Sequence, residues 1–327
     1  MQMKRTWLVL LGAFLSVFML GACTEESAPK ESATPTEEVA VEERDDIFTK
    51  DATGEAVSID EVPETIISLM PSNTEILYAL DEGSRIIGVT EFDDYPEEVT
   101  EKEQVAGMEW NVEKIIELQP DVVYAHEMSM PAADAAIQQL RDAGISVFVM
   151  PNAESFDETF QQIRTIAAHL RVDERAEQIV NEMKETIEDV QAMKGDQPTR
   201  SVFVETSAAP DIYAPGNGTF IQEMLDMIGA DNVVKEDGWV SYSTERVIEE
   251  NPDVIIVMYD YVPNAVEELK ERSGYETLTA VKEQRVYQVD ENLLSRTGPR
   301  LAEGLRALAE AIYGESGDKE EALDDAA

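Results

Sequence analysis

The stretch NVEKIIELQPDV at residues 111–122 returns as STERVIEENPDV at residues 243–254, one copy in each half of the chain. Each copy begins with a residue that favours helix N-caps, Asn111 or Ser243, places apolar residues at helical spacing and breaks at Pro-Asp. An apolar run typical of a buried strand follows each copy. The repeat therefore predicts the same helix–strand unit in two similar lobes, with the function located at the lobes or between them.

Predicted strands and helices alternate along the chain, which indicates parallel sheets flanked by helices. A helical pattern without Gly or Pro runs from Asp173 to about Lys194 and is long enough to join two lobes. We therefore predict an α/β fold with an N-terminal lobe at residues 47–170, a linker helix at residues 171–197 and a C-terminal lobe at residues 198–314. The ligand cleft is expected between the lobes.

Short motifs predict where helices start and where loops lie. The capping box SNTE at residues 72–75 is expected to open a helix at Ile76, and SFDE at residues 155–158 is expected to open another. The stretches at residues 213–218 and 290–300 are expected to be loops. These assignments place loops after strands, at the edge where open α/β sheets bind ligands.

The N-terminus has the pattern of a targeting segment. Lys4 and Arg5 precede an apolar run at residues 7–20, and small residues lead directly to Cys23, the only cysteine of the chain. Because this arrangement resembles a bacterial lipobox, we expect a signal peptide at residues 1–22 and a lipid on Cys23 that anchors the protein at the extracytoplasmic face of the cell membrane. The alternative is an ordinary secretory signal with a chance cysteine.

The chain is strongly acidic: 69 Asp and Glu against 25 Lys and Arg give a formal net charge of -44. Without a cluster of Lys and Arg, the chain has no electrostatic basis for binding nucleic acid. We interpret the charge as an adaptation for solubility in a salty or alkaline medium. Residues 23–46, rich in Glu, Ser, Thr, Pro and Ala, are predicted to form a disordered acidic tether, and residues 315–327 an acidic tail.

Common catalytic motifs are absent from the sequence. It contains no Gly-x-Ser-x-Gly, no phosphate-binding Gly-rich loop that ends in Lys-Ser/Thr and no His-Glu-x-x-His. The two histidines, His126 and His169, are too few for a nitrogen-rich metal site, so we predict no metal centre and no enzyme activity. Two alternatives stay open: a membrane-anchored hydrolase that uses paired carboxylates, and an acidic surface scaffold without a small ligand.

Aromatic residues gather in loops that are expected at strand ends. Phe92 and Tyr213 each follow a predicted strand, Trp110 precedes the first repeat helix, and Trp239 and Tyr242 precede the second. Because ligands of open α/β sheets bind at the carboxyl ends of the strands, these rings predict a large, flat, partly apolar ligand. The alternative for each ring is packing over its own lobe.

A set of motifs in fixed order resembles the substrate-binding lipoproteins of ABC importers. They are the lipobox, SLMPSNTE at residues 68–75, GVTEFDDYP at residues 88–96, the two repeats and SRTGPR at residues 295–300. The resemblance is closest to the cobalamin-binding subfamily, and haem and ferric siderophores stay open as ligands. It implies two α/β lobes joined by one rigid helix, and a monomer without a cofactor that passes a corrinoid to an ABC permease dimer and its ATPase subunits.

The resemblance also implies ligand contacts. The family's contacts are matched in residue type by Phe92, Tyr213, Trp239 and Arg296, and Trp110, Tyr242 and His126 complete the expected ligand surface. His126 is expected to be either a ligand of cobalt or haem iron or a hydrogen-bonded loop histidine.

One Glu lies in the first turn of each repeat helix, at Glu113 and Glu245. A Glu at this position offsets the positive end of the helix dipole and needs no partner for that role. The symmetry of the pair also suits a partner with two basic sockets. By resemblance, Glu113 and Glu245 are expected to dock to arginines of the permease.

Overall fold

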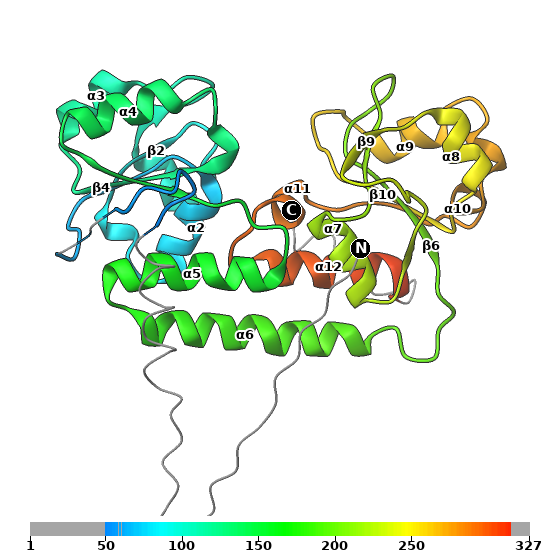
Figure 1. Cartoon of the computed structure of the whole chain (residues 1–327). Helices are drawn as coiled ribbons and strands as arrows, with labels where there is room; N and C mark the ends of the chain where they lie inside the picture. The colour runs from blue at the N-terminus through cyan, green and yellow to red at the C-terminus, as the bar shows by residue number, and fades with distance from the viewer. Residues whose placement is uncertain (1–49, 58, 60, 315–327) are drawn as a thin grey trace, which may run out of the picture. The chain divides into compact units, whose positions relative to one another are not determined.

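The computed structural model describes residues 50–57, 59 and 61–314, and no helix in this range is long and apolar enough to cross a membrane. The predicted signal peptide, Cys23, the acidic tether and the acidic tail lie outside the described residues. The described part contains two parallel β-sheets and the helices that cover them (Figure 1).

The first sheet has five parallel strands in the order β3-β2-β1-β4-β5. Its strands are β1 (Ile66–Ser68), β2 (Ile86–Thr90), β3 (Glu103–Ala106), β4 (Val122–His126) and β5 (Ser146–Met150). The helices of this half are α2 (Pro71–Ala79), α3 (Val112–Leu118), α4 (Asp134–Asp142) and α5 (Phe156–Leu170). Because the strands are parallel, their carboxyl ends all lie at one edge of the sheet.

The second sheet has four parallel strands in the order β11-β10-β6-β8. Its strands are β6 (Ser201–Glu205), β8 (Asp231–Asn232), β10 (Val254–Val257) and β11 (Val286–Gln288). A separate two-stranded antiparallel sheet pairs β7 (Tyr213–Pro215) with β9 (Trp239–Ser241). The helices are α7 (Phe220–Met227), α8 (Thr244–Glu250), α9 (Ala265–Lys270), α10 (Thr279–Lys282), α11 (Glu291–Ser295) and α12 (Leu301–Tyr313). Both halves thus have the predicted α/β architecture with parallel sheets.

The long helix α6 (Asp173–Ala192) lies between the two halves in the sequence and packs against both α5 and α12 (Figure 1). Its apolar face, which includes Ile179 and Met183, belongs to one hydrophobic cluster. That cluster extends from Ile66 in the first sheet to Ile256 in the second. The helix therefore joins the two sheets through a continuous core.

Alternating strand residues build a core on each face of the sheets. In β4, Val122 and Tyr124 belong to the cluster shared with α5 and α6, whereas Val123 and Ala125 belong to a second cluster with residues of α3 and α4. In β6, Phe203 belongs to a third cluster with residues of α8, α9 and α10. A strand that is buried on both faces has a continuous apolar sequence. The apolar runs after the two repeats are of this kind, and they form β4 and β10, which lie inside their sheets.

The two copies of the repeat adopt the same local structure. Asn111 caps α3 and Ser243 caps α8, and each side chain accepts a hydrogen bond from the backbone N–H three residues later. Both helices end at a residue with left-handed backbone, Gln119 (φ 48°) and Asn251 (φ 47°). The predicted helix–strand unit is therefore present in both halves.

The Pro-Asp step of each repeat links two neighbouring strands. Asp121 accepts a hydrogen bond through Oδ2 from the backbone N–H of Thr65 at 2.9 Å, and this bond is the main cause of the lowered pKa of Asp121. Asp253 accepts one through Oδ2 from the backbone N–H of Ser201 at 3.0 Å. Each carboxylate fixes the start of one strand beside the start of the next.

The predicted capping box at residues 72–75 is wrong. The helix α2 begins at Pro71, and its N-cap, Met70, forms no side-chain hydrogen bond. Proline suits the first helical position because its φ is already helical. An N–H at this position would have no acceptor within the helix, so its absence in proline costs nothing. Glu75 is used instead in a contact with the other end of the chain, described below.

Two predicted loops contain regular structure. Residues 213–218 include β7, because Tyr213–Pro215 pairs with β9. Residues 290–300 include α11, whose N-cap Asp290 accepts a hydrogen bond from the backbone N–H of Asn292 at 2.8 Å. The first depends on a partner strand distant in sequence, and the second is a helix of only 5 residues.

Candidate functional site

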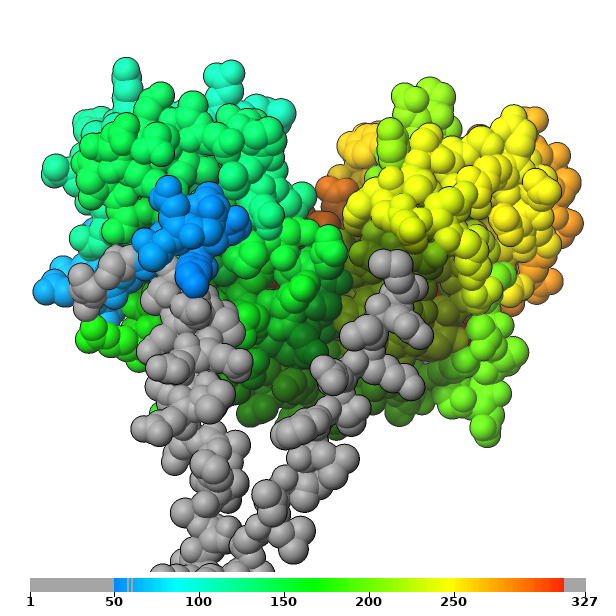
Figure 2. Space-filling view, viewed as in Figure 1, coloured from blue at the N-terminus to red at the C-terminus, as the bar shows by residue number. Residues whose placement is uncertain are grey.

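Large apolar side chains that stay exposed concentrate at the loops after the strands. In the described ranges they are Phe92, Tyr95, Met108, Ile116, Met128, Tyr213, Trp239 and Tyr261. All except Ile116, which is in α3, follow the carboxyl end of a strand or lie on the β7–β9 pair. Figure 2 shows the surface hollowed between the cyan-to-green part and the yellow part. Because gathered apolar side chains mark binding surfaces, this edge is the candidate ligand site.

The antiparallel pairing of β7 with β9 brings Tyr213 and Trp239 to the same face. In this pairing, Tyr213 lies opposite Ser241 and Trp239 lies opposite Pro215. Since side chains alternate along a strand, these four residues share one face, and the buried Ala214 lies on the other. The residues Tyr213 and Trp239 are 47% and 48% exposed. The second half therefore presents two exposed aromatic residues at diagonal positions on one face of the β7–β9 pair.

The ring of Phe92 lies in the loop after β2 and is 49% exposed. Its backbone N–H donates to Thr90 Oγ1 at 3.1 Å. The carboxylate of Asp93 accepts hydrogen bonds from the N–H and Oγ1–H of Thr90 at 2.8 and 2.6 Å, and burial raises the pKa of Asp93. The first residues of this loop are therefore hydrogen-bonded to Thr90 at the end of β2.

Arg296 is bound to protein acceptors. Its side chain is only 12% exposed, and Nη1 donates to Glu75 Oε1 at 2.9 Å and to Asp94 Oδ1 at 2.5 Å. Nη2 donates to the backbone carbonyl of Phe92 at 3.2 Å. The structure therefore places Arg296 against the loop that carries Phe92. We expected Arg296 to donate hydrogen bonds to a ligand, and it donates instead to three protein oxygens.

Two of the expected ligand aromatics support the lobes. Tyr242 is 3% exposed, and its ring packs between Phe203, at 5.2 Å between centroids, and the guanidinium of Arg246, at 4.0 Å. Trp110 is half-buried and packs on the cluster with α3 and α4. The structure thus separates these two rings from the half-exposed rings of the candidate site.

His126 ends β4 and is 2% exposed. Its Nδ1 accepts a hydrogen bond from the backbone N–H of Met128 at 3.2 Å, so the proton of the neutral ring lies on Nε2. Burial lowers the pKa of His126 to about 4. The single lone pair of this neutral ring, on Nδ1, is taken up by that hydrogen bond, while the buried Nε2 has no hydrogen-bond partner, so in this form the ring offers no lone pair to a metal ion. Within the described ranges, no group of three or more His, Cys, Asp and Glu side chains is arranged to hold a metal ion.

A buried ion pair that the sequence reading missed lies at the matching edge of the second sheet. Glu205 ends β6 with no exposed surface, and Arg272 donates to it through Nη1 and Nη2 at 2.7 and 2.8 Å. The hydroxyl of Tyr259 donates to the same carboxylate at 2.7 Å, and its ring lies 5.2 Å from the exposed ring of Tyr261. The sequence signal for this ion pair was Glu205 itself, a charged residue at the end of an otherwise apolar strand.

The two repeat glutamates are exposed. Glu113 is the second residue of α3, and Glu245 is the second residue of α8. Both carboxylates lie in the first turn, where the helix dipole stabilises a negative charge. The surface positions expected for docking are therefore available to a partner.

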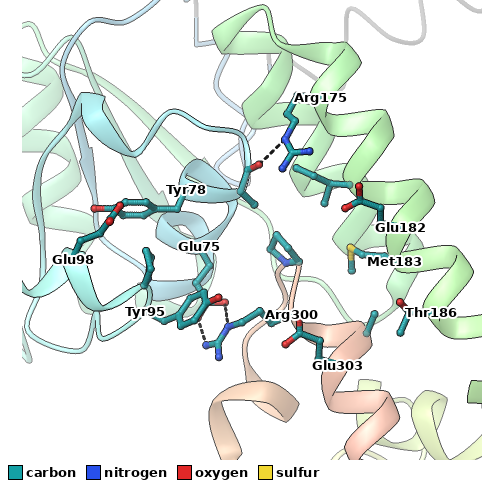
Figure 3. A pocket seen from close by; sticks show the side chains of 15 residues that line it. Glu75, Tyr78, Tyr95, Glu98, Arg175, Glu182, Met183, Thr186, Arg300 and Glu303 are labelled. Carbon is teal, nitrogen blue, oxygen red and sulfur yellow. Dashed lines mark hydrogen bonds and ion pairs between the residues drawn. The ribbon is translucent and has the colours of Figure 1, made fainter. Parts of the chain in front are cut away.

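A pocket of about 540 Å³ shares Tyr95 with the candidate site and has none of the other exposed aromatic residues in its lining. Its lining includes Tyr95, Arg175, Glu182, Met183, Arg300 and Glu303. Figure 3 shows Arg300 reaching Glu75 at this pocket, whereas Arg175 bonds to the backbone of α2. Because Phe92, Tyr213 and Trp239 are not among the lining residues, we do not place the ligand there.

Comparisons with known proteins agree with the two-sheet architecture. Residues 66–293 match the model of the periplasmic binding protein family. Over 314 residues the chain is 41% identical to the uncharacterized ABC transporter substrate-binding lipoprotein YvrC of Bacillus subtilis, covering 94% of this chain and 96% of that protein. A vitamin B12-binding protein of Pectobacterium carotovorum is 28% identical over 245 residues, which cover 73% of this chain and 85% of that protein. The crystal structure of a possible iron-binding (periplasmic solute-binding) protein of Staphylococcus epidermidis matches with a TM-score of 0.71 and 36% identity, covering 77% of this chain and 100% of that one.

Proposed function

This chain belongs to the periplasmic binding protein family, and on that basis we propose that it captures cobalamin outside the cell membrane and delivers it to an ABC importer. The name of the Bacillus subtilis relative supports the importer class, and that of the Pectobacterium relative supports the ligand. The protein binds and hands over its ligand without a chemical step. A lipid on Cys23 would keep it beside the permease.

The observation that carries the proposal is the set of half-exposed rings at the carboxyl edges, Phe92, Tyr213 and Trp239. A corrinoid is large, flat and partly apolar, so its ring system matches aromatic faces, and its amide groups match the polar surroundings. These amides carry no charge, whereas a chain with a formal charge of -44 repels anionic ligands such as catecholate or citrate complexes of iron.

Delivery requires a surface that recognises the permease. Glu113 and Glu245 are exposed at equivalent positions of the repeated unit. Two separated carboxylates suit two basic sockets of a permease dimer, because complementary charges guide the encounter and fix its orientation. We assign the docking contacts to this pair and the ligand contacts to the aromatic loops.

A second candidate ligand is iron in the form of haem or a ferric siderophore. The Staphylococcus epidermidis structure favours it, since that protein is described as possibly iron-binding and is 36% identical to this chain. The protonated Nε2 of His126 speaks against coordination by this residue, so bound haem would take its contacts from the rings.

Optical spectroscopy and calorimetry test the proposal together. The protein purified from its own host is expected to show corrinoid absorption, and titration of ligand-free protein with cobalamin is expected to release or absorb heat with a micromolar or lower Kd. Haem and a panel of ferric siderophores serve as competing ligands in the same calorimeter. If haem or a siderophore binds and cobalamin does not, cobalamin is replaced as the proposed ligand. If no ligand binds, the proposal is overturned.

A further inference from the structure

Two arginines from the end of the chain meet one buried glutamate near its beginning. Arg296 follows α11, Arg300 precedes α12, and Glu75 lies in α2 with 3% of its surface exposed. Arg300 donates to Glu75 through Nε at 3.0 Å and Nη2 at 2.7 Å, and Arg296 donates through Nη1 at 2.9 Å. Both oxygens of a buried carboxylate are therefore occupied by guanidinium groups that belong to the other half of the chain.

The same two arginines also hold the loop after β2. Arg296 donates to Asp94 Oδ1 and to the carbonyl of Phe92, at 2.5 and 3.2 Å. The guanidinium carbon of Arg300 lies 3.8 Å from the centroid of the Tyr95 ring, which is a cation–π contact. Three of the four residues from Phe92 to Tyr95 are thus contacted by one arginine or the other.

Geometry decides between two roles for Arg296. A residue that recognises ligand through hydrogen bonds needs free donors that reach the site, whereas three of the five N–H donors of Arg296 already go to protein oxygens and its side chain is only 12% exposed. A planar guanidinium with several donors in a fixed arrangement is well suited to hold a carboxylate, a second carboxylate and a carbonyl in one geometry. Glu75 in turn holds the guanidinium of Arg296, and its buried carboxylate shares its charge between Arg296 and Arg300.

We propose that Arg296, anchored by Glu75, is a positioning residue that holds the loop carrying Phe92 in its ligand-binding position from the opposite half of the chain. The proposal deepens the binding function and rests on it for its effect on affinity. The backbone contact at the Phe92 carbonyl transmits the constraint, and the ring carries it to the ligand. Arg300 fixes the other end of the same loop at Tyr95.

The test compares Arg296→Met with a matched control, Arg164→Met. Arg164 also donates two hydrogen bonds to a carboxylate, at 2.6 and 3.0 Å from the oxygens of Glu177, but it lies on α5 and does not contact the loop. In ligand-free protein, hydrogen–deuterium exchange at the amides of residues 92–95 is expected to be about tenfold faster in the Arg296→Met protein, because the loop loses its external anchor. The control is expected to leave this exchange unchanged.

A double-mutant cycle on cobalamin affinity separates positioning from general damage. We expect Arg296→Met to raise the Kd about tenfold, and much less in a Phe92→Ala background, because the arginine acts through that ring. Arg296→Lys, which keeps the charge without the planar fork, replaces Arg296→Met if that variant does not fold. Unchanged exchange with a higher Kd would overturn positioning in favour of direct ligand contact. An equal loss of cobalamin affinity in the wild-type and Phe92→Ala backgrounds would also overturn the positioning role.

Exchange in the ligand-free protein decides the positioning of the loop even if cobalamin is the wrong ligand. Absence of cobalamin binding by the unchanged protein overturns the proposed ligand alone. Wild-type exchange in the Arg296→Met protein overturns the positioning role whether or not cobalamin binds. The two failures are therefore distinguishable in one set of samples.

Discussion

Glu113 and Glu245 hold the same position in two copies of one structural unit: each is the second residue of its helix, two residues after the capping Asn111 or Ser243. Reversing the charge at either position, by Glu113→Arg or Glu245→Arg, is expected to reduce cobalamin uptake by cells roughly tenfold or more, because like charges meeting at an interface cost several kcal/mol. The Kd for cobalamin is expected to stay unchanged, since neither residue lies on the aromatic loops. Uptake of labelled cobalamin and calorimetry on purified protein measure the two effects.

Matched controls come from the same helices. Glu117 and Glu249 are also exposed, four residues further along α3 and α8. Reversing these charges changes the net charge by the same amount at the other end of each helix, so uptake is expected to stay near the wild-type rate. Normal uptake by the Glu113→Arg/Glu245→Arg double variant would refute the docking assignment.

Trp239→Ala is expected to weaken cobalamin binding by about 1–3 kcal/mol, because the half-exposed ring loses its contact area with the ligand. Isothermal titration measures the change in Kd. Ile116→Ala is the control, since Ile116 is an exposed apolar residue on α3 away from the strand ends. A wild-type Kd in Trp239→Ala would assign that ring to the packing of its own lobe.

The architecture was predictable because its signals are local. The caps Asn111 and Ser243, the apolar spacing behind them and the Pro-Asp breaks all act within a few residues, and the structure forms the expected unit at both places. The long helix was predictable for the same reason: α6 spans Asp173–Ala192 inside the predicted residues 171–197. Binary pattern and capping are sufficient for elements of this kind.

The parts that were missed depend on partners distant in sequence. Tyr213 enters a strand only because Ser241 lies opposite it, and Glu75 meets Arg296 across 221 residues. The sequence SNTE matches a capping box, but its Glu75 forms an ion pair with Arg296 that no local sequence pattern predicts. Exposure is likewise a tertiary property, so sequence alone did not separate the buried ring of Tyr242 from the half-exposed ring of Trp239.

The excess of acidic residues predicts a stability that depends on salt. With a formal charge of -44, repulsion among exposed carboxylates destabilises the folded chain at low ionic strength, and salt screens it. The midpoint of thermal unfolding is therefore expected to rise by several degrees between roughly 0.05 and 1 M NaCl. Calorimetry or circular dichroism measures it.

A charge-reduced variant is the control for the salt effect. Glu182, Glu185 and Glu188 follow one another at three-residue spacing on the exposed side of α6, where like charges repel. Changing all three to Gln is expected to raise the midpoint at low salt and to reduce the gain from added NaCl. An unfolding midpoint that ignores salt in both proteins would contradict the interpretation of the charge.

The buried His126 predicts a loss of stability in acid with a defined pH window. Its folded-state pKa of about 4 lies below the ordinary value of 6.5, so the unfolded chain binds the proton more readily between these values. The stabilising contribution is therefore complete above pH 6.5 and is lost as the pH falls through 6.5 toward 4. At about pH 5 the free energy of unfolding is expected to be about 2 kcal/mol lower from this residue alone. Urea unfolding at several pH values measures the slope. His126→Gln, which cannot titrate, is expected to show a flatter dependence over the same window, and an unchanged slope in that variant would show that His126 is protonated equally in both states.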